Sequence, residues 1–129
     1  MKNKAFTLIE LLAVIVILGL LATITIPNII NSIKISSEKA YDRQVRLIEE
    51  AAERWTVDNP EKLSEKMHYK IANIKIVDLQ TEGYLDKNLN NPITKNKMDG
   101  CVTITKNDNN GNIYNYKYNE IDECPSDDE

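Results

Sequence analysis

The chain has 129 residues, a formal net charge of −4, one histidine and two cysteines. An acidic balance gives no general attraction to phosphate backbones, which argues against direct nucleic-acid binding. The apolar residues gather at one end, because residues 6–30 read FTLIELLAVIVILGLLATITIPNII and hold one ionisable side chain, Glu10. About 100 residues remain outside this stretch, which is enough for one small domain.

Residues 6–30 are long enough to cross a bilayer once, since about 20 apolar helical residues span its core. Residues 1–5, MKNKA, form a short basic leader before them. One interpretation is a secretory signal, but no A-x-A-like cleavage site follows the apolar run. A second is a plain membrane anchor, which leaves Glu10 unexplained. Because a carboxylate is costly in lipid, Glu10 marks a candidate functional site.

A third interpretation comes from resemblance. The stretch MKNKAFTLIELLAVIVILGLLATITIP resembles the N-terminal signature of class III prepilins, which comprise type IV pilins and pseudopilins. This resemblance implies that a membrane-embedded prepilin peptidase cleaves between Ala5 and Phe6 and N-methylates Phe6. The family usually has glycine before the cut, whereas this chain has Ala5, another small residue. The segment DLQTEGYLD at 78–86, with NP at 91–92 and MDG at 98–100, is similar to Gram-positive members.

The resemblance also implies a role for Glu10 in subunit assembly. Cleavage would leave a positive amine on Phe6, and both that amine and the Glu10 carboxylate are costly when unpaired in lipid. In the family, the two groups pair between neighbouring subunits. Such a pair would neutralise both charges and set the axial stagger of a bundle of helices.

Gly19 and Pro27 are candidate helix interruptions in the apolar run. Proline lacks an N–H and clashes with the preceding turn, and glycine is a weak helix former. The residues predict a kink at Pro27. By resemblance, pilins can lose helix between these two positions in a filament, and the sequence leaves that outcome open.

Residues 31–58 are predicted to continue the helix in amphipathic form. At 100° per residue one side is apolar, and we expect the C-terminal residues to cover it. This side comprises Ile33, Ala40, Leu47, Ile48, Ala51 and Trp55, flanked by Tyr41, Val45 and Ala52. The other side carries charges of alternating sign at i, i+4 spacing, typical of a solvated face. These charges are Asp42, Arg46, Glu50 and Arg54. Asp58-Asn59-Pro60 predicts the helix end.

Residues 59–129 are predicted to form a small C-terminal globular part. A helical turn is expected over 61–67 and a short helix over 77–83, with Gly83 as its C-terminal stop. Residues 101–118 predict a β-hairpin, with strands at 101–105 and 113–118 around the turn KNDNNGN. Tyr114, Tyr116 and Tyr118 share one strand face, and we expect this face to pack near Trp55. A sugar-binding or adhesive surface is the alternative use of the three tyrosines.

The two cysteines flank this hairpin. In an exported chain an even number of cysteines indicates disulfide bonding. The resemblance supports a Cys101–Cys124 bond, since C-terminal disulfide loops are common in pilins. A pair of free reactive thiols is the alternative.

No combination of residues predicts catalysis or cofactor binding, so we expect neither an enzyme nor a cofactor. His68 is the sole histidine and has no second ligand nearby in the sequence. Residues 106–117 partly match an EF-hand loop, but Lys106 and Lys117 stand at its first and twelfth positions. No metal site is therefore predicted. Calcium binding through Asp99, Asp122 and Asp127 stays open, because some pseudopilins bind calcium near the C-terminus.

The predicted fold class is α+β, with a long N-terminal α-helical spine packed against a small antiparallel β-sheet. The predicted function is a structural subunit of a type IV pilus-like filament. Its partners would be copies of itself, other pilins and the prepilin peptidase. The subunit would cross the cell membrane once before assembly and lie in a cell-surface filament afterwards. Alternatives are a pseudopilin of a type II secretion or competence system, and a membrane-anchored binding module that never polymerises.

Overall fold

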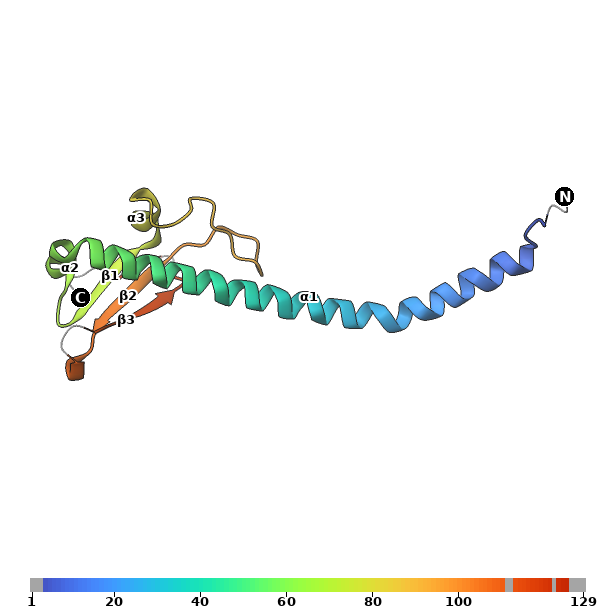
Figure 1. Ribbon diagram of the computed structural model, residues 1–129, viewed down its shortest axis with the longest axis horizontal. Helices are drawn as coiled ribbons and strands as arrows, with labels where there is room; N and C mark the ends of the chain where they lie inside the picture. The colour runs from blue at the N-terminus through green and yellow to red at the C-terminus, as the bar shows by residue number, and fades with distance from the viewer. Residues whose placement is uncertain (1–3, 111–112, 122, 126–129) are drawn as a thin grey trace. The chain divides into compact units, whose positions relative to one another are not determined.

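The computed structural model describes residues 4–110, 113–121 and 123–125 (Figure 1). The chain divides into two compact units, Met1–Ser37 and Glu38–Glu129. Helix α1, Leu8–Asp58, contributes to both units.

The first unit consists of the N-terminal part of α1 and the few residues before it. Residues 4–7 have no regular structure, and the helix begins at Leu8. The helix continues without a break through Gly19 and Pro27. An apolar run rich in leucine and isoleucine can sustain a helix across one proline, because each remaining residue still adds a backbone hydrogen bond.

The second unit joins the C-terminal part of α1 to short helices and one small sheet (Figure 1). The helices after α1 are α2, Pro60–Lys66, and α3, Ile76–Thr81, with a 3₁₀ turn η1, Asp108–Asn110. The strands are β1, Ile71–Lys75, β2, Cys101–Lys106, and β3, Tyr114–Asn119. The predicted end of α1 at Asp58 is confirmed, and Pro60 starts α2 immediately after it. Gly83, with φ of 86°, follows α3 at the predicted stop.

The sheet is antiparallel throughout, in the order β1-β2-β3. Residues aligned across the three strands point to the same face, so Ala72 pairs with Ile104 and Ile74 pairs with Val102. On the far side of β2, Val102 pairs with Tyr118. This period-2 alternation gives the sheet one apolar face, and the C-terminal part of α1 packs on it. The predicted α+β class is therefore confirmed.

Strand β1 was missed by the sequence analysis, which predicted no element between residues 67 and 77. Burial alternates along the strand, with Ala72 and Ile74 buried, but the sequence IANIK does not alternate regularly because it begins with two apolar residues. Tyr69 and Lys70 precede the strand in a two-residue turn with φ of 45° and 72°, a turn usually made by Asn or Gly. The strand exists because β2 offers a pairing edge, which local propensity cannot reveal.

The core lies between α1 and the sheet. From α1 the buried side chains are Ile48, Ala51, Ala52, Trp55 and Thr56. The expectation that Leu47 lies on the buried side of the helix is wrong, since this residue is 50% exposed. The buried stripe of the helix is centred on Ile48 and Ala52, with Tyr41 and Val45 at its margin, so Leu47 falls outside it. Ile33, in the first unit, is also exposed.

The tyrosine stripe of β3 packs against the core as predicted. Tyr118 is 7% exposed, and its hydroxyl donates to the Asp99 carbonyl oxygen at 2.8 Å. Tyr114 and Tyr116 are half-buried against the same cluster. On α1, the Trp55 indole N–H donates to Glu82 Oε2 at 2.9 Å, which ties the helix to the end of α3.

Candidate assembly site

Phe6 and Glu10, the predicted assembly residues, lie at the start of α1. Phe6 is 88% exposed and precedes the helix. The Thr7 backbone N–H donates to Glu10 Oε2 at 2.8 Å, and the Thr7 hydroxyl donates to the same oxygen at 3.1 Å. In return, the Glu10 backbone N–H donates to Thr7 Oγ1 at 3.4 Å. Thr7 and Glu10 thus form a reciprocal capping box at the helix N-terminus.

The capping box was missed by the sequence analysis. Its signal was present, because Thr7-Leu8-Ile9-Glu10 matches the S/T-x-x-E pattern before an apolar run. The negative charge of Glu10 also lies in the first helical turn, where the helix dipole favours an anion. Glu10 therefore has a structural role within its own chain, which the resemblance alone did not suggest.

The helix after this cap exposes a long apolar surface. Every large apolar side chain from Phe6 to Ile35 is at least half exposed, with fractions from 50% to 88%. One segment of α1 near the N-terminus is long and apolar enough to cross a membrane. Soluble monomers rarely expose apolar surface on this scale, so lipid or other protein must cover it.

Gly19 and Pro27 lie inside the continuous helix. A Cβ atom at Gly19 would meet no described atom within 4 Å outside the local helix backbone. Nothing in the described part of the monomer therefore requires glycine at that position. Pro27 removes the N–H that would bond to the Thr23 carbonyl. Whether this region kinks or loses helix in an assembly stays a prediction.

Polar side chains surround Pro27 and bond to the helix backbone. Thr25 Oγ1 donates to the Leu21 carbonyl oxygen at 3.1 Å, and Ser32 Oγ donates to the Asn28 carbonyl oxygen at 2.9 Å. Threonine and serine bonds of this kind satisfy the side chain in an apolar setting, and they often accompany local bending of a helix. The stretch around Pro27 is thus the most polar part of the apolar run after Glu10.

In the second unit, a disulfide joins Cys101 at the start of β2 to Cys124 in the tail. Their Cα atoms are 5.8 Å apart, and 23 residues separate them in sequence. Gly100 comes just before the bond, with φ of 127°. A Cβ atom there would collide with the Asn119 carbonyl oxygen and lie 3.2 Å from the Glu120 Cα. Glycine is required because β3 and its continuation pass directly against this point.

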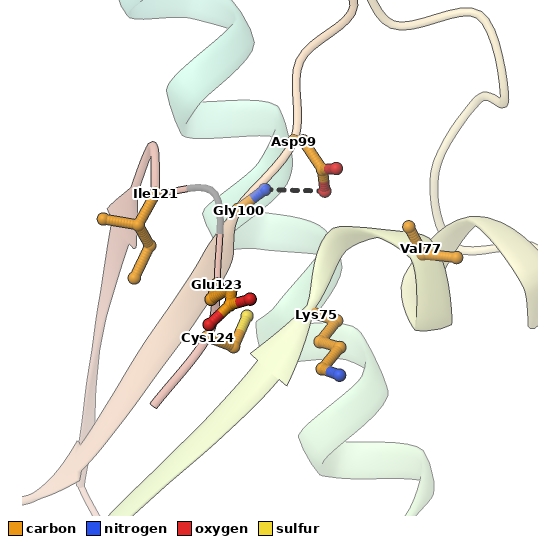
Figure 2. Close-up of a pocket in the computed structure, with 7 residues that line it drawn as sticks. All are labelled: Lys75, Val77, Asp99, Gly100, Ile121, Glu123 and Cys124. Atoms are coloured by element: carbon orange, nitrogen blue, oxygen red, sulfur yellow. Dashed lines mark hydrogen bonds between the residues drawn. The ribbon is translucent and has the colours of Figure 1, made fainter. Parts of the chain in front are cut away.

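A pocket of about 400 Å³ lies beside this disulfide (Figure 2). Its lining residues are Lys75, Val77, Asp99, Gly100, Ile121, Glu123 and Cys124. Asp99 is the one candidate calcium ligand in the described ranges, and its Oδ1 accepts the Gly100 N–H at 2.8 Å. Asp122 and Asp127 lie outside the described residues. Within the described ranges no three His, Cys, Asp or Glu side chains form a metal-binding group.

Comparison with known proteins gives one family match and two relatives. Residues 1–26 match the prokaryotic N-terminal methylation motif. The resemblance to type IV pilins and pseudopilins is confirmed. The ComG operon protein 3 homolog of Bacillus licheniformis is 28% identical over 92 residues, covering 71% of this chain and 84% of that protein. The type II secretion system core protein G of Escherichia coli is 41% identical over 59 residues, covering 45% and 40% respectively. No solved structure matches the chain.

Proposed function

We propose that this pilin-like chain is a structural subunit of a type IV pilus-like filament. The observation that carries the proposal is a coincidence of two features. The methylation motif at residues 1–26 covers the same segment whose apolar side chains are left exposed. The subunit would be anchored by this segment in the membrane and would bury it against other subunits after assembly.

The proposal includes cleavage between Ala5 and Phe6, followed by methylation of the Phe6 amine. Residues 4–7 support it, because they are exposed and lie outside the helix. A peptidase binds its substrate in an extended form, so a scissile bond before the first helical turn needs no unwinding. The Phe6 side chain is also free of the helix and can enter a binding pocket.

Glu10 would pair with the Phe6 amine of a neighbouring subunit. The capping box does not prevent this, because a carboxylate has several lone-pair sites and can accept bonds from Thr7 and from an amine together. The carboxylate would already be oriented by two hydrogen bonds before assembly. Less conformational freedom would then be lost when the intersubunit pair forms.

Two substitutions at Glu10 separate its charge from its cap. Glu10→Gln keeps an acceptor that can complete the capping box but removes the charge, whereas Glu10→Ala removes both. We expect both variants to reach the membrane and neither to form filaments in electron micrographs of sheared cell-surface material. Filaments formed by Glu10→Gln at the wild-type level would contradict the charge pairing.

Processing is tested on the protein recovered from the sheared fraction. Mass spectrometry should find an N-terminus that begins with N-methylated Phe6. An intact leader, residues 1–5, in assembled protein would contradict the proposed processing. If the chain is purified as a membrane monomer under all conditions and no filament contains it, it is a non-polymerising membrane-anchored module.

A second candidate is a pseudopilin of a type II secretion or competence system. The similarity to the type II secretion system core protein G favours it. Deletion of the chain would then abolish protein export or transformation without removing long surface filaments. If the chain is instead a pilin, its deletion would remove the filaments.

A further inference from the structure

A groove runs along the C-terminal part of α1, beside the outer edge of β3. It consists of two adjoining cavities of about 350 and 390 Å³, which share Glu53, Tyr114 and Tyr116. The remaining lining residues are Arg46, Glu49, Glu50, Asn115, Thr56, Val57, Pro60 and Ile113. We call this the acidic groove, since three glutamates and one arginine line it.

The acidic groove has the chemistry of a site for a cationic, partly apolar segment. Three glutamates and two tyrosines line it together, so a lysine could pair its ammonium with a carboxylate and pack its stem on a ring. Burial, and more weakly the charge of Glu53, raise the pKa of Tyr116. At the apolar end, Val57 is 72% exposed and Ile113 is 49% exposed. This end leaves hydrophobic surface without a partner in the described chain.

The groove is preformed rather than a gap left by loose packing. Strand β3 is at the edge of the sheet, and the Tyr118 N–H on its outer side is bound by Glu49 Oε1 at 3.0 Å. This bond fixes the strand beside the helix and blocks one exposed edge donor. An incoming segment would therefore meet side chains that already hold their positions.

A complementary segment exists elsewhere in the same unit. Residues 87–98, KNLNNPITKNKM, contain three lysines and no acidic residue, and we call them the lysine loop. The buried Asn91 orders this loop, because its Oδ1 accepts the backbone N–H groups of Ile93 at 2.8 Å and Thr94 at 3.2 Å. Its backbone N–H also donates to the Asn96 carbonyl oxygen at 2.8 Å.

The tip of the lysine loop presents the groups that the acidic groove would bind. Ile93 is 52% exposed, and Lys95 and Lys97 are exposed beside it. An apolar tip next to two cations matches a groove with an apolar end next to three carboxylates. Because the loop is ordered before binding, docking it would cost less conformational entropy than ordering a free segment.

The loop and the groove lie at different levels along α1. Asn91 Nδ2 donates to Glu120 Oε1 at 3.4 Å, and the Tyr41 hydroxyl donates to Glu120 Oε2 at 3.2 Å, which fixes the loop near Tyr41. The groove is centred on Glu53, and at 1.5 Å per residue this is about 18 Å further along the helix. Two different, complementary surfaces on one chain make a head-to-tail contact between copies. Such contacts produce open helical assemblies when the rotation from one copy to the next does not close a ring.

We propose that the acidic groove of one subunit binds the lysine loop of a second copy of this chain. The proposal deepens the proposed filament function and rests on it. The contact would add a charge-matched link between the second units of neighbouring copies, separate from the pairing of N-terminal helices. It would be weakened by salt, because its charged groups are largely exposed.

Charge reversal tests the contact in the full-length chain in its native host. Glu53→Lys and Lys95→Glu should each lower sheared filament protein at least ten-fold while the membrane pool is unchanged. The double variant should restore filaments to within three-fold of wild type. Glu65→Lys, an exposed reversal on α2 outside the groove, should have no effect and is the matched control.

Photocrosslinking identifies the occupant directly. A photoreactive p-benzoylphenylalanine replacing Ile113 should give a crosslinked dimer of this chain, attached to the tryptic peptide 88–95. The proposal would be overturned if Glu53→Lys formed filaments at the wild-type level. It would also be overturned if the crosslink joined another protein or another peptide. Failure of the filament function is distinct, because then the unmodified chain and the Glu65→Lys control would form no filaments either.

Discussion

The disulfide is predicted to supply a large share of the stability of the second unit. Cys101 and Cys124 are separated by 23 residues, and the bond fixes the tail to the start of β2. In the chain-entropy treatment, closing a loop of this length stabilises the fold by about 3.4 kcal/mol at 25 °C. Small domains typically have about 5–15 kcal/mol in total, so the loss would be severe.

The assay uses the fluorescence of Trp55, the one tryptophan in the sequence, which is buried in the core of this unit. Full-length protein in detergent is unfolded in urea with and without a reductant. With a urea dependence of about 1–3 kcal/mol/M, a loss of 3.4 kcal/mol lowers the midpoint by roughly 1–3 M. Cys124→Ser should reproduce this shift without reductant, because Cys124 is only partly buried and its replacement leaves little cavity.

Reductant should have no further effect on the Cys124→Ser variant, which makes that variant its own control. If reduction of the wild-type protein leaves the urea midpoint unchanged, the tail is not a stabilising cross-link. The reasoning from loop closure would then be wrong. A lower midpoint with a larger urea dependence would instead indicate that the bond also keeps the unfolded state compact.

Three further outcomes follow from single contacts. Thr7→Val should lose the capping box with Glu10, weaken the helix start by about 0.5–2 kcal/mol and speed amide exchange in the first turn, whereas Thr7→Ser should not. Gly100→Ala should destabilise the second unit by more than about 2 kcal/mol, because the new Cβ would collide with the Asn119 backbone and the φ at this position is strained for alanine. An unchanged urea midpoint, measured by Trp55 fluorescence, would contradict this. Burial raises the pKa of Tyr118, so the folded state holds this proton more tightly than the unfolded state. The contribution of Tyr118 to stability should be constant below about pH 10 and fall above it, and Tyr118→Phe should show a shallower fall in urea midpoints between pH 9 and 11.

The sheet shows which strands the sequence alone could predict. β2 and β3 were predictable because CVTIT and YNYKY alternate strongly and a loop rich in Asn and Gly separates them. β1 was not, since its residues become a strand only when β2 is beside them. The centre of the buried stripe on α1 was misplaced for the same reason. Leu47 lies near that stripe in a helical projection, but the sheet covers the side occupied by Ile48 and Ala52.

The candidate assembly site and the acidic groove differ in how far the sequence predicts them. The candidate residues could be named from the sequence because the leader, Phe6 and Glu10 lie in one local motif, which needs no tertiary information. The Thr7–Glu10 cap was readable for that reason too, although the sequence analysis did not use it. The acidic groove was not readable, because Glu53 and Tyr114 come from distant segments that only the packing of β3 against α1 brings together.

The two proposed contacts would differ in what they require of the protein's surroundings. Glu10 acts in an apolar setting, where its pairing with an amine is strong but both groups are costly to leave alone. Glu53 and Lys95 are exposed to solvent, where a charge pair is weak and screened by salt. A filament that depends on both should therefore lose its outer contact first as ionic strength rises, and its yield should fall toward that of Lys95→Glu. Sheared filaments of the wild type and of Lys95→Glu should then become alike in high salt, and a persistent difference there would show that Lys95 acts by other means than charge.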